Sequence, residues 1–173
     1  MRFFSGFSLK NEEYLFDKYT RKSEYTICGF SYGAIAAFRM TIDMLNAGKR
    51  VDTLQLLSPA FFQSKDEKFK RLQLISYQKN QDVYMEQSIS SCFLPYNKKI
   101  VEYKETTIVE LKELLNYEWS LEDLKKIEER GVKIEIYLGG EDKIIDVNAA
   151  KELFLNVSTV TYVKSANHFL QIN

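Results

Sequence analysis

Apolar residues follow two different spacings along this chain, and the spacing changes from segment to segment. Short apolar runs, which are typical of strands buried in a sheet, cover residues 2–4, 24–28, 51–57, 132–138 and 158–163. The spacing of an amphipathic helix, with apolar residues recurring every three or four positions, covers residues 11–19, 34–45 and 147–155. Strands that alternate with helices predict an α/β fold, in which helices flank both faces of a mostly parallel sheet.

The alternation is interrupted between residues 61 and 130, where the sequence is charged, helical and broken by Pro95. Helical spacing is carried there by Phe69, Leu72, Ile75, Leu111, Leu114 and Leu115, and by the amphipathic segment 121–129 before Gly131. A chain of 173 residues is expected to form one domain. We therefore predict a single compact domain with a core of residues 1–60 and 131–173. Residues 61–130 are expected to form a helical lid or cap over one end of the sheet.

Composition and charge exclude several classes of protein. The 24 basic and 24 acidic residues cancel, whereas nucleic-acid-binding domains usually have a basic excess, so we expect no nucleic acid as a partner. No run approaches the roughly 20 apolar residues that span a bilayer, and the N-terminal apolar run is too short for a signal peptide. Cys28 and Cys92 form no disulfide framework and, with a single histidine, no usual zinc site. We expect a cytoplasmic monomer without membrane association, metal or cofactor.

The candidate chemistry begins at Gly29-Phe30-Ser31-Tyr32-Gly33, a G-x-S-x-G motif. It follows a predicted strand and opens a predicted helix, which is the setting of a nucleophilic serine on a tight strand-to-helix turn. Gly29 and Gly33 suit this turn because it leaves no room for side chains around the serine. The helix N-terminus favours the negative charge that develops when Ser31 attacks a carbonyl. The alternative interpretation is a glycine-flanked turn whose serine has no catalytic role.

A nucleophilic serine needs a general base, and His168 is the only histidine in the chain. It lies in a loop after the last predicted strand, at the edge where sites form in parallel sheets. Three acids, Glu141, Asp142 and Asp146, follow the strand predicted at 132–138 and reach the same edge. Any of them could orient the imidazole. Alternatively, the lone histidine is structural and the acidic turn is solvated surface.

The order of Ser31, Asp142 and His168 along the chain resembles that of the α/β-hydrolase family. The sequence G-x-D-x-I-I at residues 140–145 is similar to the acid loop of that family, and it lies a similar distance before the histidine. The resemblance implies that Asp142 is the acid of a triad with Ser31 and His168, which would make the protein a serine hydrolase.

Two departures from the family pattern are visible. The family has a His-Gly pair in an early loop whose backbone amide helps to bind the oxyanion, and this chain has Phe4-Ser5-Gly6-Phe7 there. The resemblance therefore implies an oxyanion hole made by the backbone N–H groups of Phe7 and Tyr32. The family also has two more strands before this point, so the chain resembles a shortened version of the fold.

A narrower resemblance concerns the substrate. The start of the chain, the motif at residues 29–34 and the Asn-His-Phe sequence at 167–169 together resemble the BioV-type pimeloyl-ACP methyl ester esterases of biotin synthesis. This resemblance implies a carboxylesterase that removes the methyl ester from a pimeloyl chain carried on acyl carrier protein (ACP).

Such a substrate needs an apolar slot and a basic rim, because ACP is acidic and a basic surface would steer it. The candidates for the slot are Phe61, Phe62, Phe93 and Trp119, followed by Leu72, Ile75 and Leu94. The candidates for the rim are Lys65, Lys68, Lys70 and Arg71, followed by Lys98 and Lys99. Two plainer interpretations stay open: the apolar side chains pack the insertion onto the sheet, and the basic ones form a solvated helix face.

Other functions fit the same pattern. A general carboxylesterase or an acyl thioesterase would use an identical triad, because the triad is indifferent to the leaving group. A hydrolase-fold binding protein without activity is the alternative outside enzymes. An α/β domain of unrelated function with a coincidental motif is a further one.

Overall fold

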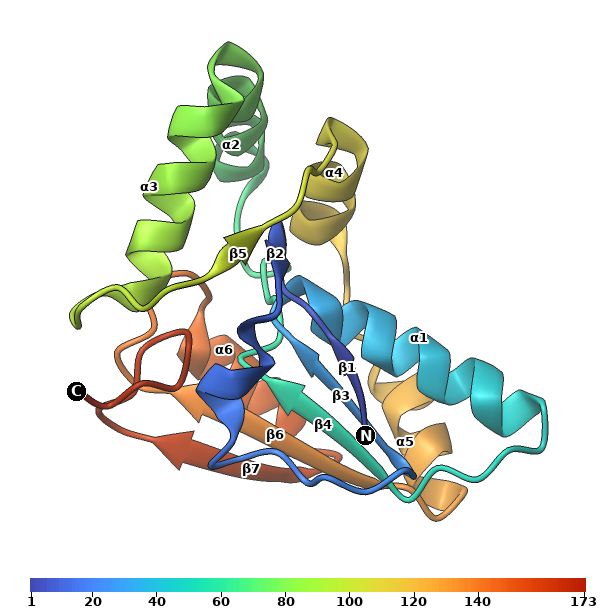
Figure 1. Cartoon of the computed structure of the whole chain (residues 1–173). Helices are drawn as coiled ribbons and strands as arrows, with labels where there is room; N and C mark the ends of the chain where they lie inside the picture. The colour runs from blue at the N-terminus through green and yellow to red at the C-terminus, as the bar shows by residue number, and fades with distance from the viewer.

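Five strands form a parallel sheet in the order β1-β3-β4-β6-β7, as the computed structural model of residues 1–173 shows (Figure 1). The strands are β1 (Arg2–Phe4), β3 (Thr26–Phe30), β4 (Thr53–Leu57), β6 (Lys133–Gly139) and β7 (Thr159–Val163). Every neighbouring pair in this sheet is parallel. The expected α/β fold class is therefore confirmed, and each expected strand lies close to its predicted position.

The register of the sheet brings three loops to one edge. Phe30 is opposite Leu57, Leu57 is opposite Tyr137, and Gly139 is opposite Val163, so β3, β4, β6 and β7 all end near the same line. The loops that follow β3, β6 and β7 therefore start side by side, although they are far apart in the sequence.

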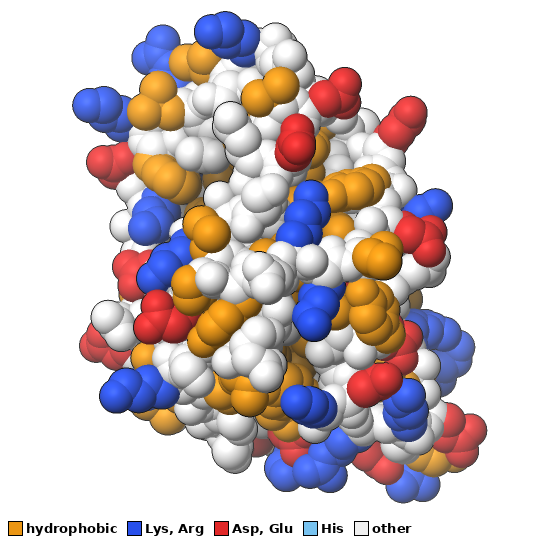
Figure 2. All heavy atoms as spheres, turned by 60° about the vertical axis from the view of Figure 1, so that its left-hand side comes forward, with side chains coloured by type: hydrophobic (Ala, Val, Ile, Leu, Met, Phe, Trp, Pro, Cys, Tyr) orange, Lys and Arg blue, Asp and Glu red, His pale blue; other side chains and the backbone are white.

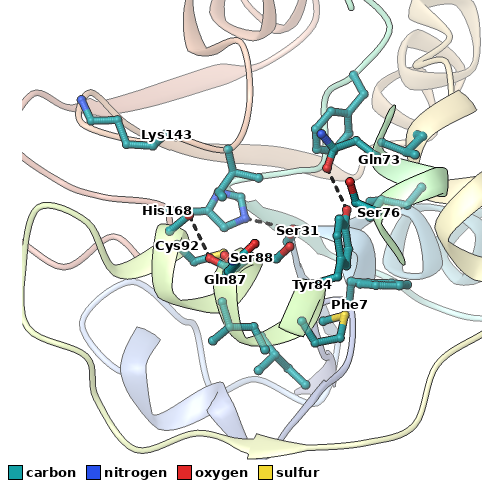
Figure 3. A pocket seen from close by; sticks show the side chains of 18 of the residues that line it. Phe7, Ser31, Gln73, Ser76, Tyr84, Gln87, Ser88, Cys92, Lys143 and His168 are labelled. Carbon is teal, nitrogen blue, oxygen red and sulfur yellow. Dashed lines mark hydrogen bonds between the residues drawn. The ribbon is translucent and has the colours of Figure 1, made fainter. Parts of the chain in front are cut away.

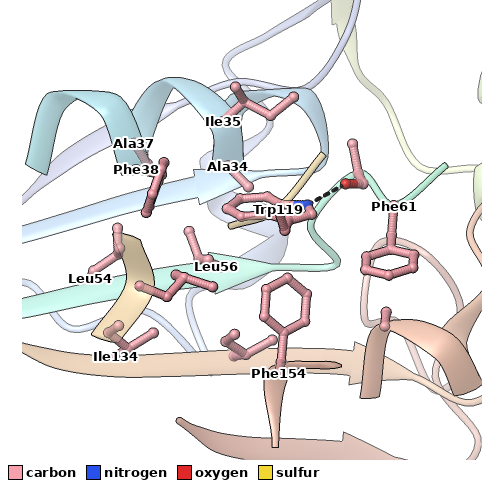
Figure 4. Close-up of a cluster of buried hydrophobic side chains, with 14 of the residues drawn as sticks. Ala34, Ile35, Ala37, Phe38, Leu54, Leu56, Phe61, Trp119, Ile134 and Phe154 are labelled. Carbon is pink, nitrogen blue, oxygen red and sulfur yellow. Dashed lines mark hydrogen bonds between the residues drawn. The ribbon is translucent and has the colours of Figure 1, made fainter. Parts of the chain in front are cut away.

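One face of the sheet is covered by α1 (Tyr32–Asn46), α5 (Leu121–Glu129) and α6 (Val147–Phe154). Side chains in strands alternate between faces, so every second residue of β4 and β6 points toward these helices. The residues that meet on this face include Ala34, Phe38, Leu54, Leu56, Trp119, Ile134 and Phe154, all buried (Figure 4). This cluster is the main hydrophobic core.

The opposite face is covered differently from our expectation. The segment predicted to be helical at 11–19 contains only η1 (Glu12–Phe16), a short 3-10 helix. Asn11, just before it, has the left-handed φ of 62°, and the residues after it run back along the sheet to β3 as an irregular segment (Figure 1). The apolar cover on this face comes from Phe16, Phe30 and Phe169, whose rings pack together.

The middle of the chain stands over the edge where the strands end (Figure 1). It contains α2 (Glu67–Lys79), α3 (Gln81–Phe93) and α4 (Ile108–Asn116). A second, two-stranded sheet joins it to the N-terminal region, because β2 (Leu9–Lys10) pairs antiparallel with β5 (Glu102–Tyr103). α4 also contributes to the main core, through Leu111, Leu114 and Leu115, and α5 follows it before β6. The division into a core and a lid that spans residues 61–130 stays a prediction. None of the helices combines the length and the apolar composition needed to cross a bilayer.

Truncating the centre of the core should destabilise the protein strongly. Leu56 is 0% exposed between α1 and α6, so Leu56→Ala removes buried methyl groups and leaves a cavity. We expect the free energy of unfolding in urea to fall by about 2–5 kcal/mol. Leu155→Ala is the matched control, since Leu155 is 56% exposed, and it should change that free energy by less than about 0.5 kcal/mol. Equal effects of the two substitutions would contradict the assigned core.

Candidate active site

Ser31 occupies the sharp turn between β3 and α1. Its backbone has φ 52° and ψ −116°, a conformation that costs energy for any residue with a side chain. A Cβ atom on Gly29 would lie 2.3 Å from the carbonyl oxygen of Gly33, and one on Gly33 would lie 2.1 Å from the carbonyl oxygen of Phe4. Both contacts are backbone against backbone and cannot relax. The two glycines of the motif are therefore required by the close approach of β1, β3 and α1.

The side chains of Ser31, His168 and Asp142 form one chain of hydrogen bonds at the end of the sheet. His168 Nε2 lies 2.9 Å from Ser31 Oγ (Figure 3), and His168 Nδ1 lies 2.6 Å from Asp142 Oδ2. His168 and Asp142 are both buried. The Asp142 carboxylate can only accept a hydrogen bond, so in the neutral imidazole the proton lies on Nδ1. Nε2 is then free to accept a hydrogen bond from the hydroxyl of Ser31. This is the arrangement of a serine activated by a histidine base.

The backbone of its own loop holds Asp142 in place. Its Oδ1 accepts hydrogen bonds from the N–H groups of Ile144, at 2.7 Å, and Ile145, at 3.3 Å. Oδ1 is thus occupied by the loop, and Oδ2 is directed at the imidazole of His168.

The two competing acids have other partners. Glu141 pairs with Lys143 at 3.1 Å on the surface. Asp146 is the N-cap of α6, where it accepts from the N–H of Ala149 at 3.1 Å and from Ser64 Oγ at 3.0 Å. The bond from Ala149 is the largest cause that lowers the pKa of Asp146 below its ordinary value. Of the three acids that the sequence left open, the structure brings only Asp142 to His168.

The loop that carries His168 packs closely against Gly139 and Gly140, which precede Asp142. The sequence indicates these two glycines only as a turn. A Cβ on Gly139 would lie 2.3 Å from the carbonyl oxygen of Asn167, and one on Gly140 would lie 2.2 Å from that of Lys164. The Gly-Gly pair directly after a strand was the available signal for this close approach. The ring of His168 also packs on Phe30, with centroids 5.1 Å apart.

The expected oxyanion donors lie beside the serine. Neither the backbone N–H of Phe7 nor that of Tyr32 donates to an acceptor within the protein. The rings of the two residues meet edge to face, with centroids 5.9 Å apart. Their N–H groups are therefore unoccupied, as donors to an oxyanion must be before substrate arrives.

A polar link between Tyr32 and the middle segment has no signal in the sequence. The hydroxyl of Tyr32 donates to Glu113 on α4, and the same carboxylate pairs with Arg39 on α1. Burial and the bond to Glu113 raise the pKa of the Tyr32 hydroxyl, and the bond from Tyr32 is the main cause that lowers the pKa of Glu113. The link fastens α4 to the start of α1.

Comparisons with known proteins bear on the fold. No family model matches the sequence, and no curated protein matches it. One hundred chains of known structure match. A hydrolase from Oleispira antarctica has a TM-score of 0.62 at 13% identity, covering 85% of this chain and 59% of that one. The esterase EaEST from Exiguobacterium antarcticum has a TM-score of 0.62 at 16% identity, covering 83% of this chain and 59% of that one. BioG from Haemophilus influenzae has a TM-score of 0.53 at 12% identity, covering 96% of this chain and 87% of that one.

The chain has the α/β-hydrolase fold. At identities of 12 to 16%, the likeness establishes the fold and leaves activity and substrate to the site itself. The chain spans 59% of the length of the first two proteins.

A pocket of about 390 Å³ opens on the nucleophile elbow of this α/β-hydrolase fold, where Ser31 and His168 both line it (Figure 3). Its apolar lining includes Phe7, Phe62, Phe69, Met85, Ile89, Leu114 and Leu115. Its neutral polar lining comes from α2 and α3 and includes Gln73, Ser76, Tyr84, Gln87, Ser88 and Ser91. Lys143 is the one Lys or Arg side chain in the lining, and no Asp or Glu lines the pocket.

Of the aromatic residues expected to bind substrate, the structure places only one in the pocket. Phe62 lines the pocket, whereas Phe61, Phe93 and Trp119 do not, so these three expectations are wrong. The accessory candidates Leu72, Ile75 and Leu94 are exposed and do not line the pocket either.

The three misplaced aromatic residues are core residues on opposite faces of the sheet. Phe61 and Trp119 pack edge to face on Phe154 of α6, at 6.1 and 5.3 Å between centroids (Figure 4). Phe93 stacks on Phe169 at 4.2 Å. An aromatic side chain suits a core position and a pocket wall equally, so the sequence could not separate the two roles.

One of the basic residues expected to face ACP is buried. Lys70 is 8% exposed and pairs with Glu67 at 3.4 Å, so it is not available as a surface contact, and this expectation is corrected. Lys68 and Arg71 are exposed, and Lys65 is half-buried with its ammonium 5.6 Å from the ring centre of Phe69. Lys98 and Lys99 are exposed as well.

No group of three or more His, Cys, Asp or Glu side chains is arranged to hold a metal ion. Cys28 and Cys92 are free thiols, and burial raises the pKa of both well above the ordinary value. A thiol with a raised pKa is a poor nucleophile at neutral pH, so Cys92 is part of the pocket wall and not a second reactive group.

The placement of Trp119 can be tested by stability. Trp119→Phe removes the bond from its indole Nε1 to the carbonyl oxygen of Ala60, which is 2.8 Å long and buried. We expect the free energy of unfolding in urea to fall by about 1–3 kcal/mol, because the buried carbonyl loses its partner. Tyr103→Phe, at a position that is 48% exposed, is the control and should leave the free energy unchanged. Unchanged stability of Trp119→Phe would contradict its position in the core.

Proposed function

We propose that this protein is a serine carboxylesterase that hydrolyses the methyl ester of a pimeloyl chain carried on ACP, a step of biotin synthesis. The observation that carries the esterase assignment is the hydrogen-bonded chain from Ser31 through His168 to Asp142, at 2.9 and 2.6 Å. It lies at the floor of a pocket, with two unoccupied backbone N–H groups beside it.

The proposed reaction is acyl transfer in two steps. His168 Nε2 takes the proton of Ser31 Oγ as this oxygen bonds to the ester carbonyl carbon, and the carbonyl electron pair moves onto oxygen. The bond from carbon to the methoxy oxygen then breaks, and His168 returns the proton so that methanol leaves. Water attacks the acyl-enzyme by the same proton path, and the free acid is released as Ser31 regains its proton. Asp142 stabilises the imidazolium that forms in each step.

The oxyanion that forms in each step would be bound by the N–H groups of Phe7 and Tyr32. Donors that are already in place cost no reorganisation, and each is worth roughly 3–4 kcal/mol of transition-state stabilisation in comparable sites. Tyr32 opens α1, so the helix dipole adds to this effect.

The pocket suits an acyl chain with polar groups attached. Its volume of about 390 Å³ lies within the usual range for small-molecule sites, and 12 of its 20 lining residues are hydrophobic. An acyl chain would lie along the apolar wall that contains Phe62, and the side chains of α2 and α3 would hydrogen-bond its polar parts.

A carrier protein of acidic surface would be attracted to the face that carries α2 and α3. Figure 2 shows this side: basic side chains run along its middle among hydrophobic ones, and acidic side chains lie mostly toward its margins. The exposed Lys68 and Arg71 of α2, and Lys143 at the pocket, would contribute to steering. The match to BioG covers 96% of this chain and 87% of that one, so it supports a shared fold over nearly the whole of both chains and nothing about the substrate.

Replacing the nucleophile should abolish turnover and leave the fold intact. Methyl-pimeloyl-ACP incubated with wild-type protein should lose the mass of one methylene group, as measured by mass spectrometry of the carrier. Ser31→Ala should give no change, whereas Ser90→Ala, which alters an exposed serine of α3 outside the pocket, should behave as wild type.

Other outcomes of this experiment identify the alternatives. Loss of the whole acyl group would indicate a thioesterase. No change with wild type would overturn the biotin assignment, and labelling of Ser31 by a fluorophosphonate would then separate a general carboxylesterase from a binding protein without activity.

Replacing the acid should be nearly as severe as replacing the nucleophile. Asp142→Asn preserves the shape of the pair with His168 but favours the wrong tautomer of the ring, and turnover should fall on the order of 10⁴-fold. The matched controls are Glu141→Gln and Asp146→Asn, which should keep turnover within a few-fold of wild type because neither acid contacts the imidazole. A large loss from either control, with Asp142→Asn active, would show that the acid is misassigned.

A further inference from the structure

A fully buried carboxylate lies beneath the loop that carries Phe7. Glu12 is 0% exposed, and its Oε1 accepts a hydrogen bond of 2.7 Å from the backbone N–H of Gly6. Its other oxygen, Oε2, is buried without a hydrogen-bond partner. Glu12 does not line the pocket, so it does not contact substrate there.

Stability gives no reason for an acidic side chain at this position. Removing a carboxylate from water costs free energy, and a buried oxygen without a partner adds to the cost. Burial accordingly raises the pKa of Glu12 above its ordinary value. An apolar side chain of similar size would avoid both costs. What the carboxylate adds is its bond to the buried N–H of Gly6, and the hydroxyl of Ser5 in the same loop and the charge of Lys104 also favour its ionised form.

The bonds around Gly6 fix the direction of the Phe7 N–H. The N–H of Gly6 donates to Glu12, and the carbonyl oxygen of Gly6 accepts from the N–H of Leu9 at 3.1 Å. In a trans peptide the C=O and the following N–H point in opposite directions, so the orientation of the Gly6 carbonyl sets that of the Phe7 N–H. A Cβ on Gly6 would lie 2.9 Å from the ring of Phe30, so the loop is also pressed against the elbow.

The backbone between the loop and Glu12 is strained. Ser8 and Asn11 have φ values of 59° and 62°, in the left-handed region that non-glycine residues rarely adopt. These two residues turn the chain back so that Glu12 comes to lie under Gly6. Strain of this kind persists where surrounding contacts enforce it, and it clusters at functional sites.

We propose that Glu12 is a positioning residue, which holds the loop of residues 5–8 so that the Phe7 N–H points to the place where the oxyanion forms beside Ser31. The inference rests on the proposed esterase function and deepens it. A small displacement of an oxyanion donor is costly: about 10²-fold in rate for a shift near 1 Å.

The test compares three variants of Glu12 with a neighbouring control. Glu12→Leu removes the acceptor, Glu12→Asp keeps the charge but shortens the side chain by one methylene, and Glu12→Gln keeps an oxygen that can accept from Gly6. Glu13→Gln is the control, because Glu13 lies on the same 3-10 helix and makes no hydrogen bond to the loop.

The kinetic readout is hydrolysis of a p-nitrophenyl acyl ester. With Glu12→Leu and Glu12→Asp, kcat should fall about 10- to 100-fold while KM changes little, since the lost interaction acts only in the transition state. Glu12→Gln and the control should stay within a few-fold of wild type. Glu12→Leu leaves the buried N–H of Gly6 without an acceptor, so its melting temperature should fall as well. The split between kcat and KM, and the retained activity of Glu12→Gln, separate a positioning role from a merely structural one.

A second readout needs no turnover. Exchange of the Gly6 amide proton with solvent, followed by NMR, should be faster in Glu12→Leu and Glu12→Asp than in wild type and unchanged in the control. Wild-type kcat in folded Glu12→Asp, or an unchanged Gly6 amide in that variant, would overturn the proposal even if Glu12→Leu does not fold. Failure of wild type to hydrolyse esters or to be labelled by a fluorophosphonate would instead overturn the proposed function. The Gly6 amide would then still decide whether Glu12 holds the loop.

Discussion

The tight contact among three backbone segments around Ser31 is the constraint on which the site depends. The end of β1, the end of β3 and the first turn of α1 approach so closely that a Cβ on Gly33 would lie 2.1 Å from the Phe4 carbonyl oxygen. This contact holds the serine at φ 52°, a conformation that an isolated chain would leave. It also places the loop that follows β1 directly beside the elbow. Ser31 and the loop of Phe7 are therefore fixed by the same packing.

The second half of the site depends on a comparable contact at β6 and β7. Gly139 and Gly140 let the histidine loop lie against the acid loop, where Asp142 holds the imidazole at 2.6 Å. Parallel strands in register bring these two halves together, because each loop begins where its strand ends at a common edge. The sheet thus positions the two loops, and the glycines allow their backbones to approach closely.

Much of this arrangement could be predicted from local sequence. A serine flanked by glycines between a strand and a helix is a narrow pattern, because few turns require small residues at both positions. A single histidine leaves no choice of base. The acid could not be chosen among three neighbours, because the choice depends on which carboxylate faces the ring.

Tertiary packing decides what the sequence could not show. Trp119 and Phe61 are aromatic residues of the segment expected to form the pocket but fill the core, and Lys70, in a run of charged residues, is buried. Glu12 lies in a segment with the spacing of an ordinary amphipathic helix, and no neighbouring residue indicates that its side chain bonds to Gly6. In each case the partner is remote in the sequence or reached through an unusual backbone turn.

The small β2–β5 sheet has a mechanical consequence. Leu9 pairs with Tyr103, the N–H of Lys104 donates to the Ser8 carbonyl oxygen, and the hydroxyls of Ser8 and Thr106 are 2.8 Å apart. The segment that covers the pocket is thus tied by hydrogen bonds to the chain immediately after Phe7. If the segment over the pocket moved far enough to admit a bulky ligand, it would either carry the loop of residues 5–8 with it or break these bonds. Access to the pocket and the alignment of the loop are consequently coupled.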